Sequence, residues 1–255
     1  MNKNAFDKVK SILRQIILPQ PVKTLIKKAW ILTLRGSRFY CSVCERDFRK
    51  FFEFGVNPRP NTMCPGCGSV ERHRLLWVAL RDLQNNDLIQ RGGGRLLHVV
   101  PETCLAERFR REYDYLSIDL EGKKAMMAMD LTAMTFEDES FDAIVCNHVL
   151  EHIPDDRKAM KELFRMLKPG GWASIQVSIK GDITREDLSI TDPKERLRLY
   201  GQDDHVRYYG YDFTDRLKDA GFDVLMIPKS NLLNPDEQAR ISLDVENEVV
   251  LCRKI

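Results

Sequence analysis

The stretch FDAIVCNHVLEHIPDDRKAMKELFRMLKPGGWASI, residues 141–175, decides the fold of this chain. Its first seven residues, 141–147, are almost all apolar, which favours a buried strand. Helical periodicity then runs over residues 155–168 and stops at a KPGG turn. A second apolar run, 172–179, follows directly. A strand, a helix and another strand in this order predict a parallel βαβ unit.

The same alternation extends to both sides of this stretch. Further strands are predicted at 95–100, 115–119, 222–227 and 247–252, and further helices at 104–112 and 212–220. This pattern predicts an α/β fold with a doubly wound, mostly parallel sheet and helices on both faces. One connection is short. Only about five residues separate the strand at 115–119 from a possible strand at 125–129, whereas a parallel crossover normally needs about a dozen. We expect either a crossover almost without a helix or an irregular edge segment there.

Four of the seven cysteines form two C-x-x-C pairs, Cys41 with Cys44 and Cys64 with Cys67. Each pair can place two thiolates on one metal ion, and the two pairs together complete a tetrahedron. Four soft anionic ligands suit zinc and leave no open position, so the sequence predicts a structural zinc site. The other three cysteines lie in apolar patterns and are expected in the core, which disfavours a disulfide framework.

Charge is distributed unevenly along the chain, whose total is +2. Residues 1–50 carry a net charge of +9 and the remainder −7. Two amphipathic helical patterns, at 5–18 and 22–30, fall in the basic part. In one interpretation both helices pack on the body of the protein, the second through its apolar face: Val22, Leu25, Ile26, Ala29 and Trp30. In the other interpretation, residues 1–35 contact an anionic membrane surface.

These patterns divide the chain into four segments. They are a basic amphipathic helical arm (1–38), a zinc-ribbon-like module (39–70), a connecting helix and glycine linker (71–94), and an α/β domain (95–255) with a polar insertion at 181–211. Ser69 is a suitable N-cap for the connecting helix. The insertion is expected to act as a lid or specificity element, although a simple surface excursion is the alternative.

Polar residues follow three of the predicted strands. Asp119 ends the strand at 115–119, Asp130 follows the short segment at 125–129, and Asn147 ends the strand at 141–147. Ligands of open parallel sheets bind at the carboxyl ends of the strands. A carboxylate at the position of Asp119 can accept both hydroxyls of a ribose, and Asp130 can address an adenine amino group.

The segment 141–175 resembles the class I S-adenosylmethionine-dependent methyltransferases of the type-11 group, and the resemblance extends over about residues 95–255. It implies a seven-stranded Rossmann-like sheet with an antiparallel last strand, and S-adenosylmethionine as the cofactor. By this resemblance Asp119 holds the ribose hydroxyls and Asp130 with Leu131 contacts the adenine. Asn147 and His148 would line the side of the cofactor that faces the substrate.

The chain departs from this family at the first turn. Residues 96–104, LLHVVPETC, contain no glycine, although the family usually has a glycine-rich turn there. Glu102 is positioned to meet the methionine ammonium of the cofactor in a charge-assisted contact. The alternative is a non-catalytic domain in which cofactor binding is weakened or lost.

Methyl transfer to a hydroxyl needs a base, and two histidines are candidates. His148 follows a strand and is expected to face the cleft, whereas His205 lies in the insertion. His152 is expected to be a structural hydrogen-bonding residue. The predicted enzyme is therefore a methyltransferase with His148 and His205 as candidate catalytic residues.

Two classes of acceptor remain open. The favoured one is a small molecule or a glycan, methylated at oxygen or nitrogen. The other is RNA, held by the zinc ribbon, the basic arm and the pair Arg72 and Arg74. The start of the chain has no apolar signal core, and no apolar run reaches the length of a membrane span. We therefore expect a cytoplasmic protein that is peripheral at the inner membrane face if the arm binds lipid.

Overall fold

The computed structural model describes residues 20–55, 57–243 and 248–255. The helical pattern predicted at 5–18 lies outside these residues. The described part of the chain divides into two compact units. One contains the residues up to Val78 and those from Leu233 to Leu243, and the other contains Ala79–Leu232 and residues 248–255.

The second unit is built on a seven-stranded sheet with the order β12-β13-β9-β8-β5-β6-β7. The strands are β5 (Arg95–Val99), β6 (Asp114–Asp119), β7 (Met127–Ala128), β8 (Phe141–Asn147), β9 (Leu167–Gln176), β12 (Asp223–Pro228) and β13 (Glu248–Arg253). The pairs from β7 to β9 are parallel, whereas β13 is antiparallel to both β9 and β12. The predicted Rossmann-like sheet with an antiparallel last strand is confirmed.

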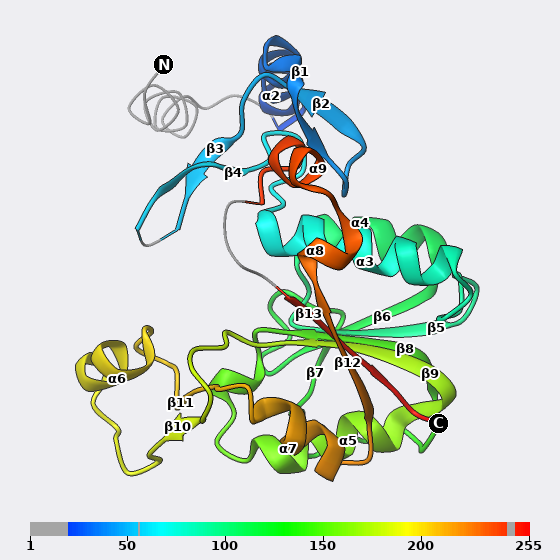
Figure 1. Cartoon of the computed structure of the whole chain (residues 1–255), viewed down its shortest axis with the longest axis vertical. Helices are drawn as coiled ribbons and strands as arrows, with labels where there is room; N and C mark the ends of the chain where they lie inside the picture. Colours follow the sequence, from blue (N-terminus) through cyan, green and yellow to red (C-terminus); the bar gives the residue numbers. More distant parts are fainter. Residues whose placement is uncertain (1–19, 56, 244–247) are drawn as a thin grey trace. The chain divides into compact units, whose positions relative to one another are not determined.

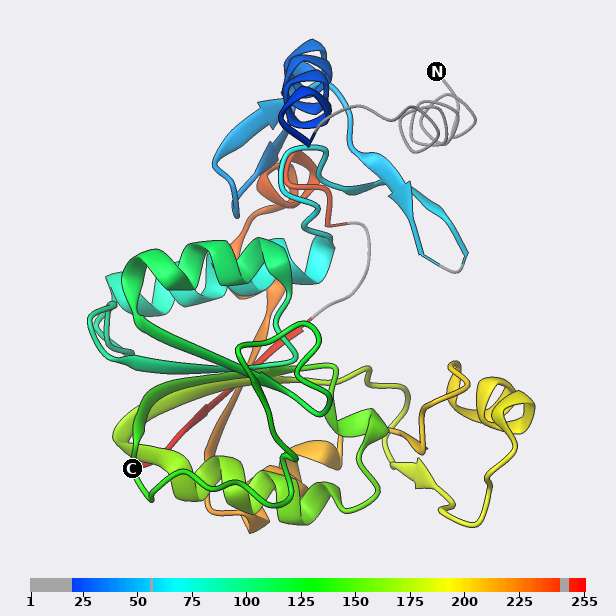
Figure 2. The same ribbon diagram turned by 180° about the vertical axis from the view of Figure 1, so that it is seen from behind.

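Helices cover both faces of this sheet (Figures 1 and 2). On one face lie α4 (Thr103–Glu112) and the C-terminal half of α3 (Glu71–Asn85), and on the other lie α5 (Asp156–Met166) and α7 (Phe213–Asp219). Helix α5 begins where the Asp155 side chain accepts a hydrogen bond from the Lys158 amide, 3.0 Å away. Its buried side chains recur every three or four residues, so a single apolar stripe faces the core: Ala159, Met160, Leu163 and Met166.

Two local features differ from a regular βαβ fold. The connection from β6 to β7, residues 120–126, contains no helix, and β7 pairs with β6 over only two residues. Strand β9 begins at Leu167, so the predicted KPGG turn lies within the strand, at a shift in register opposite β8. A Cβ on Gly171 would lie 2.9 Å from the carbonyl oxygens of Asp142 and Lys168, and this close approach requires glycine.

The first unit is made of short elements. It contains α2 (Gln20–Thr33), the hairpin strands β1 (Arg35–Cys41) and β2 (Arg46–Phe48), the strands β3 (Phe52–Phe54) and β4 (Arg59–Met63), and α9 (Pro235–Arg240). The helix predicted at 22–30 is present, but the expected inward face is wrong: Val22, Leu25, Ile26 and Ala29 are exposed, Leu25 by 68%. Trp30 is the exception, because its ring stacks on the Phe52 ring, with the centroids 5.3 Å apart.

The polar insertion of the second unit contains β10 (Arg185–Glu186), α6 (Pro193–Tyr200) and β11 (Arg207–Tyr208). A short helical turn, η1 (Leu150–His152), follows β8, and α8 (Lys229–Leu232) follows β12. Arg207 is fully buried and donates to the carbonyl oxygens of residues 150, 153 and 154, which ties the insertion to the segment after β8. Among the described residues, no helix combines the length and the apolar character that crossing a bilayer requires.

Candidate active site

A chain of hydrogen-bonded side chains runs along the carboxyl ends of the central strands. It begins at His98 on β5, whose ring is fully buried. Its Nε2 lies 2.7 Å from a carboxylate oxygen of Glu102, and its Nδ1 lies 3.1 Å from the hydroxyl of Tyr115 on β6. The Glu102 carboxylate is therefore fixed at the end of β5. Sequence reasoning missed His98, although a histidine inside an otherwise apolar strand was a visible signal.

The chain continues from Glu102 to β8 and β9. The side-chain amide of Asn147 donates to Glu102 at 3.4 Å, and its carbonyl accepts from the hydroxyl of Ser174 at 3.0 Å. Gln176 donates to the same Ser174 hydroxyl at 3.1 Å. These bonds orient the Asn147 amide so that its donor faces Glu102. The sequence placed Asn147 at the end of a strand and Glu102 in the first turn, and the structure brings the two side chains together.

Asp119 ends β6 and is 8% exposed. One carboxylate oxygen accepts from the amides of Glu121 and Lys123, at 2.9 and 3.2 Å, and the other from the amide of Lys124 at 2.7 Å. Burial raises the pKa of Asp119, but these backbone hydrogen bonds outweigh it and hold the pKa below its usual value. A carboxylate offers about four acceptor positions, so the loop at 121–124 shares this group with any ribose hydroxyl.

Asp130 and Leu131 follow β7. The Asp130 carboxylate accepts from the amide and the hydroxyl of Thr132, at 2.8 and 2.9 Å, which lowers its pKa. The side chain of Leu131 is 4% exposed and belongs to the hydrophobic core of the sheet. Adenine contact by these two residues stays a prediction.

The glycine-free first turn is formed by Val100. Its backbone has φ of 49°, in the left-handed region, and its amide donates to the Ile118 carbonyl at 2.8 Å. A β-branched residue in this conformation stores strain of order 1–3 kcal/mol. Glu102 then stands at the N-cap of α4 without capping it through its side chain. The turn therefore keeps the conformation for which glycine is suited, and Glu102 is left to bond His98 and Asn147.

His148 forms a pair with a buried carboxylate. Its backbone also has a positive φ, 52°, and its Nδ1 lies 3.4 Å from an oxygen of Glu151. Glu151 is 1% exposed, and the same oxygen accepts from the Ser178 amide at 2.8 Å. Burial raises the pKa of Glu151, but hydrogen bonds from His148 and Ser178 outweigh it and lower the pKa. A carboxylate held in this way fixes the orientation of the imidazole beside it.

His205 belongs to a different group of side chains. It is buried, and its Nδ1 lies 3.2 Å from the Tyr200 carbonyl oxygen. Its ring packs edge-on against His152, with centroids 4.7 Å apart, and the Nδ1 of His152 lies 3.2 Å from a carboxylate oxygen of Asp204. His152 therefore does form a polar pair, as expected of it, while the catalytic role of His205 stays a prediction.

Residues 90–175 match the family described as "Methyltransferase domain". This part of the chain is therefore similar to a methyltransferase domain. The segment whose sequence resembles class I methyltransferases thus lies in the matched region, and the sheet order of the second unit agrees with it.

Curated and solved proteins similar to this chain bear related names. It is 25% identical over 218 residues to the sterol 24-C-methyltransferase erg6 of Schizosaccharomyces pombe, covering 79% of this chain and 51% of that protein. The erg6 protein of Aspergillus fumigatus is 28% identical over 141 residues, 54% of this chain and 33% of its own length. The chain thus spans at most about half of these relatives.

A solved structure shows the same fold as the methyltransferase domain. It is an S-adenosylmethionine dependent methyltransferase from Mesorhizobium loti, with 15% identity and a TM-score of 0.51. The match covers 71% of this chain and 98% of that chain. At this identity the likeness concerns the fold.

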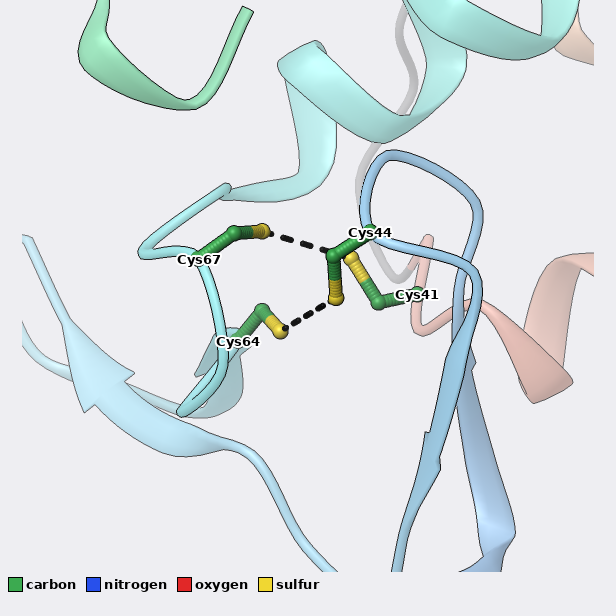
Figure 3. A group of neighbouring side chains, drawn as sticks. All are labelled: Cys41, Cys44, Cys64 and Cys67. Atoms are coloured by element: carbon green, nitrogen blue, oxygen red, sulfur yellow. Dashed lines mark hydrogen bonds between the residues drawn. The ribbon is translucent and has the colours of Figure 1, made fainter. Parts of the chain in front are cut away.

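Apart from the methyltransferase domain, the four predicted zinc ligands converge in the first unit (Figure 3). The sulfurs of Cys41 and Cys67 lie 3.7 Å apart, as do those of Cys44 and Cys64, and all four lie within 4.8 Å of one another. Zinc with Zn–S bonds of about 2.3 Å separates its sulfurs by roughly 3.75 Å, so the donors fit this metal.

The loops that carry these cysteines are closely packed. A Cβ on Gly66 would lie 2.9 Å from the Phe48 ring and 3.3 Å from the Cys44 sulfur, so the second C-x-x-C turn requires glycine there. The hydroxyl of Ser69 contacts the sulfurs of Cys41 and Cys67, at 3.1 and 3.2 Å. The connecting helix begins at Glu71, so Ser69 serves the cysteine cluster rather than the predicted N-cap.

Arg74 does not form, with Arg72, the basic pair that the sequence offered for holding RNA. It is fully buried and donates to the carbonyl oxygens of Thr62, Ser69, Ile241 and Ser242, with its guanidinium over the Phe51 ring. It is thereby a structural cross-link within the first unit and does not present its charge to a nucleic acid.

Proposed function

We propose that this protein transfers a methyl group from S-adenosylmethionine to a small-molecule or glycan acceptor, at oxygen or nitrogen. The observation that carries the proposal is the match of residues 90–175 to a methyltransferase domain, in which β6 and β8 end in Asp119 and Asn147 and Glu102 follows β5. These residues supply carboxylate and amide groups at the edge where open parallel sheets bind their ligands.

The residues at this edge suit a cofactor that carries a ribose, an amine and a positive charge. Asp119 accepts a ribose hydroxyl in the acceptor position that the 121–124 loop leaves open. Asp130 and Leu131, which follow β7, contact the adenine in this proposal. Glu102, oriented by His98 and Asn147, faces the ammonium group. When bound, S-adenosylmethionine supplies an electrophilic methyl group on a sulfonium that leaves as a neutral thioether.

The protein's own contribution is to position the acceptor, exclude water and remove a proton. His148 is the better of the two candidate bases, because the buried Glu151 carboxylate lies 3.4 Å from its Nδ1 and orients its ring. His205 has its Nδ1 at the Tyr200 carbonyl and is 5% exposed, which leaves less room for an acceptor.

Small-molecule acceptors are supported by the names of the similar proteins, which refer to sterols and to demethylmenaquinone. RNA is not supported in the same way, because the guanidinium of Arg74 donates its hydrogen bonds to backbone carbonyl oxygens. We therefore make the small-molecule or glycan acceptor the proposal.

Two further parts of the proposal concern the first unit. Zinc bound by Cys41, Cys44, Cys64 and Cys67 has a structural role, because four protein ligands leave no position for a substrate. The arm makes peripheral contact with an anionic membrane, and the exposed apolar residues of α2, such as Leu25, support this. The protein would then act in the cytoplasm, at the inner membrane face.

The proposal is tested first by cofactor binding, which requires no knowledge of the acceptor. Calorimetry with S-adenosylhomocysteine is run on the wild type and on Asp119→Ala. Each charged hydrogen bond contributes roughly 1.5–3 kcal/mol, so Asp119→Ala weakens binding about tenfold to a thousandfold. Asp114→Ala, at the exposed start of the same strand, is the matched control. If the wild type gives no heat and no thermal shift at millimolar ligand, the domain is a non-catalytic one and the proposal fails.

A further inference from the structure

A second group of metal-ligating side chains lies in the second unit, apart from the four cysteines. It consists of His152, Asp204 and His205, and one potential ligand atom from each lies within 4.8 Å of the others. His152 belongs to the η1 turn directly after β8, whereas Asp204 and His205 belong to the insertion. The three side chains are therefore brought together by the tertiary structure from two separate segments.

Both segments are held rigidly where they meet. The amide of Val206, next to His205, donates to the Glu151 carbonyl oxygen at 2.9 Å, next to His152. The guanidinium of Arg207 bonds the carbonyl oxygens of Leu150 and Pro154, at 2.8 and 2.7 Å, and its own charge is paired with Glu186 at 2.8 Å. Ligand groups fixed in advance by their neighbours are what a metal site requires.

The hydrogen bonding of His205 leaves the ring in the form that binds metals. Its Nδ1 can only donate to the Tyr200 carbonyl oxygen, which places the lone pair on Nε2. Metal-binding histidines commonly donate their other ring nitrogen to a backbone carbonyl in this way.

The spacing of the other two ligands also suits a metal ion. His152 Nδ1 and the Asp204 carboxylate lie 3.2 Å apart, and ligands on one tetrahedral zinc lie roughly 3.3–3.5 Å apart. Asp204 is mostly exposed, with 64% of its side chain accessible, so it can adjust its rotamer without disturbing the core.

We propose that His152, Asp204 and His205 bind one divalent first-row transition-metal ion, with Zn²⁺ as the reference ion. Two imidazoles and one carboxylate make a borderline donor set that suits such ions better than Ca²⁺ or Mg²⁺. Three protein ligands leave at least one coordination position open to water or to an oxygen of a ligand, unlike the closed cysteine site. The proposal of this site does not rest on cofactor binding or on methyl transfer.

The experiment titrates the metal-free full chain with Co²⁺ and then with Zn²⁺. Cobalt bound by thiolates shows strong sulfur-to-metal charge-transfer absorption, whereas cobalt bound by nitrogen and oxygen does not. We expect one equivalent with that absorption and a second without it, and calorimetry with Zn²⁺ gives the affinity of the second. The variants are His152→Asn and Asp204→Asn. Their matched controls are His148→Asn, a neighbouring histidine outside the group, and Asp203→Asn, an adjacent exposed aspartate.

Loss of an outer partner of a metal ligand costs about 10–100-fold in affinity, so loss of a ligand itself weakens the second site at least about tenfold. The two controls retain the wild-type affinity. The proposal is wrong if the wild type binds only the sulfur-ligated equivalent up to millimolar metal. It is equally wrong if Asp204→Asn titrates like Asp203→Asn, because the group would then be a simple His–Asp ion pair. Asp204 is exposed, so loss of folding does not obscure the result.

Discussion

Different interactions stabilise the cysteine module and the seven-stranded sheet. The module consists of short strands, of three to seven residues, around four converging thiols and one buried arginine. The sheet has strands of five to ten residues at its centre and a continuous apolar core from β5 to β13. A module of that size buries too little apolar surface to be stable alone, whereas a sheet with helices on both faces does not need a metal.

The difference teaches where each region is vulnerable. The module depends on a few polar cross-links, so the loss of one ligand should affect all of it. The sheet depends on many small apolar contacts, so a single truncation should weaken it without unfolding it. The same division applies to the proposed function, because the residues proposed to bind the cofactor lie on the sheet and not on the module.

The largest effect is expected from removing a zinc ligand. Cys64→Ser should release the metal and loosen the segment 39–70, since structural zinc supplies about 10–16 kcal/mol of apparent binding energy in small zinc modules. Metal content and amide hydrogen exchange measure this, and the amides of β5 and β8 should keep their protection. Cys104→Ala, a cysteine outside the cluster, is the control and should retain the metal. A fully folded, metal-free wild type would contradict the zinc proposal.

A core truncation in the sheet should give a smaller effect and leave the module intact. Leu163 is fully buried on α5, and Leu163→Ala should lower the free energy of unfolding of the sheet by about 2–5 kcal/mol through lost contacts and a residual cavity. Chemical denaturation measures the loss, and the bound metal should stay at the wild-type level. Loss of metal in this variant would show that the two regions do not depend on separate forces.

A substitution just after β5 should affect cofactor binding and leave the stability of both regions unchanged. Glu102→Gln removes the charge but keeps a group that can bond His98 and Asn147, so we expect S-adenosylhomocysteine binding to weaken less than in Asp119→Ala. A loss of a few-fold is consistent with one weakened charge-assisted contact, about 0.5–1.5 kcal/mol. Calorimetry measures it, with Glu107→Gln on the following helix as the control. Unchanged affinity would remove Glu102 from the site.

The smallest effect is expected at the arm. Anionic vesicles should bind the full chain more strongly than a chain that begins at Arg38, and added salt should reduce the difference, because the basic charges are screened. Vesicle co-sedimentation at two salt concentrations measures this, with neutral vesicles as the control. Equal binding by both chains would mean that the arm does not contact membranes.

The sequence by itself determined the elements of the sheet and the ligands of the cysteine cluster. Strands and helices follow from local periodicity, and β8 covers the predicted residues 141–147. The cysteine ligands could be predicted equally well, because the two cysteines of each C-x-x-C pair lie within one turn of the chain. The sequence did not predict the exposure of the apolar side chains of α2 or the burial of Arg74. A helical pattern does not show which other segments will cover each face of the helix.

The tertiary structure alone decided how the functional groups meet. His98 on β5 contacts Tyr115 on the neighbouring strand β6, and Ser174 on β9 donates to Asn147 on the neighbouring strand β8. His152 and His205 are 53 positions apart, and their segments are joined by the hydrogen bonds of Arg207 and of the Val206 amide. The physical reason is that local patterns reflect the interaction of each residue with its own segment. Contacts between distant segments depend on the register of the strands and on how the connecting loops close.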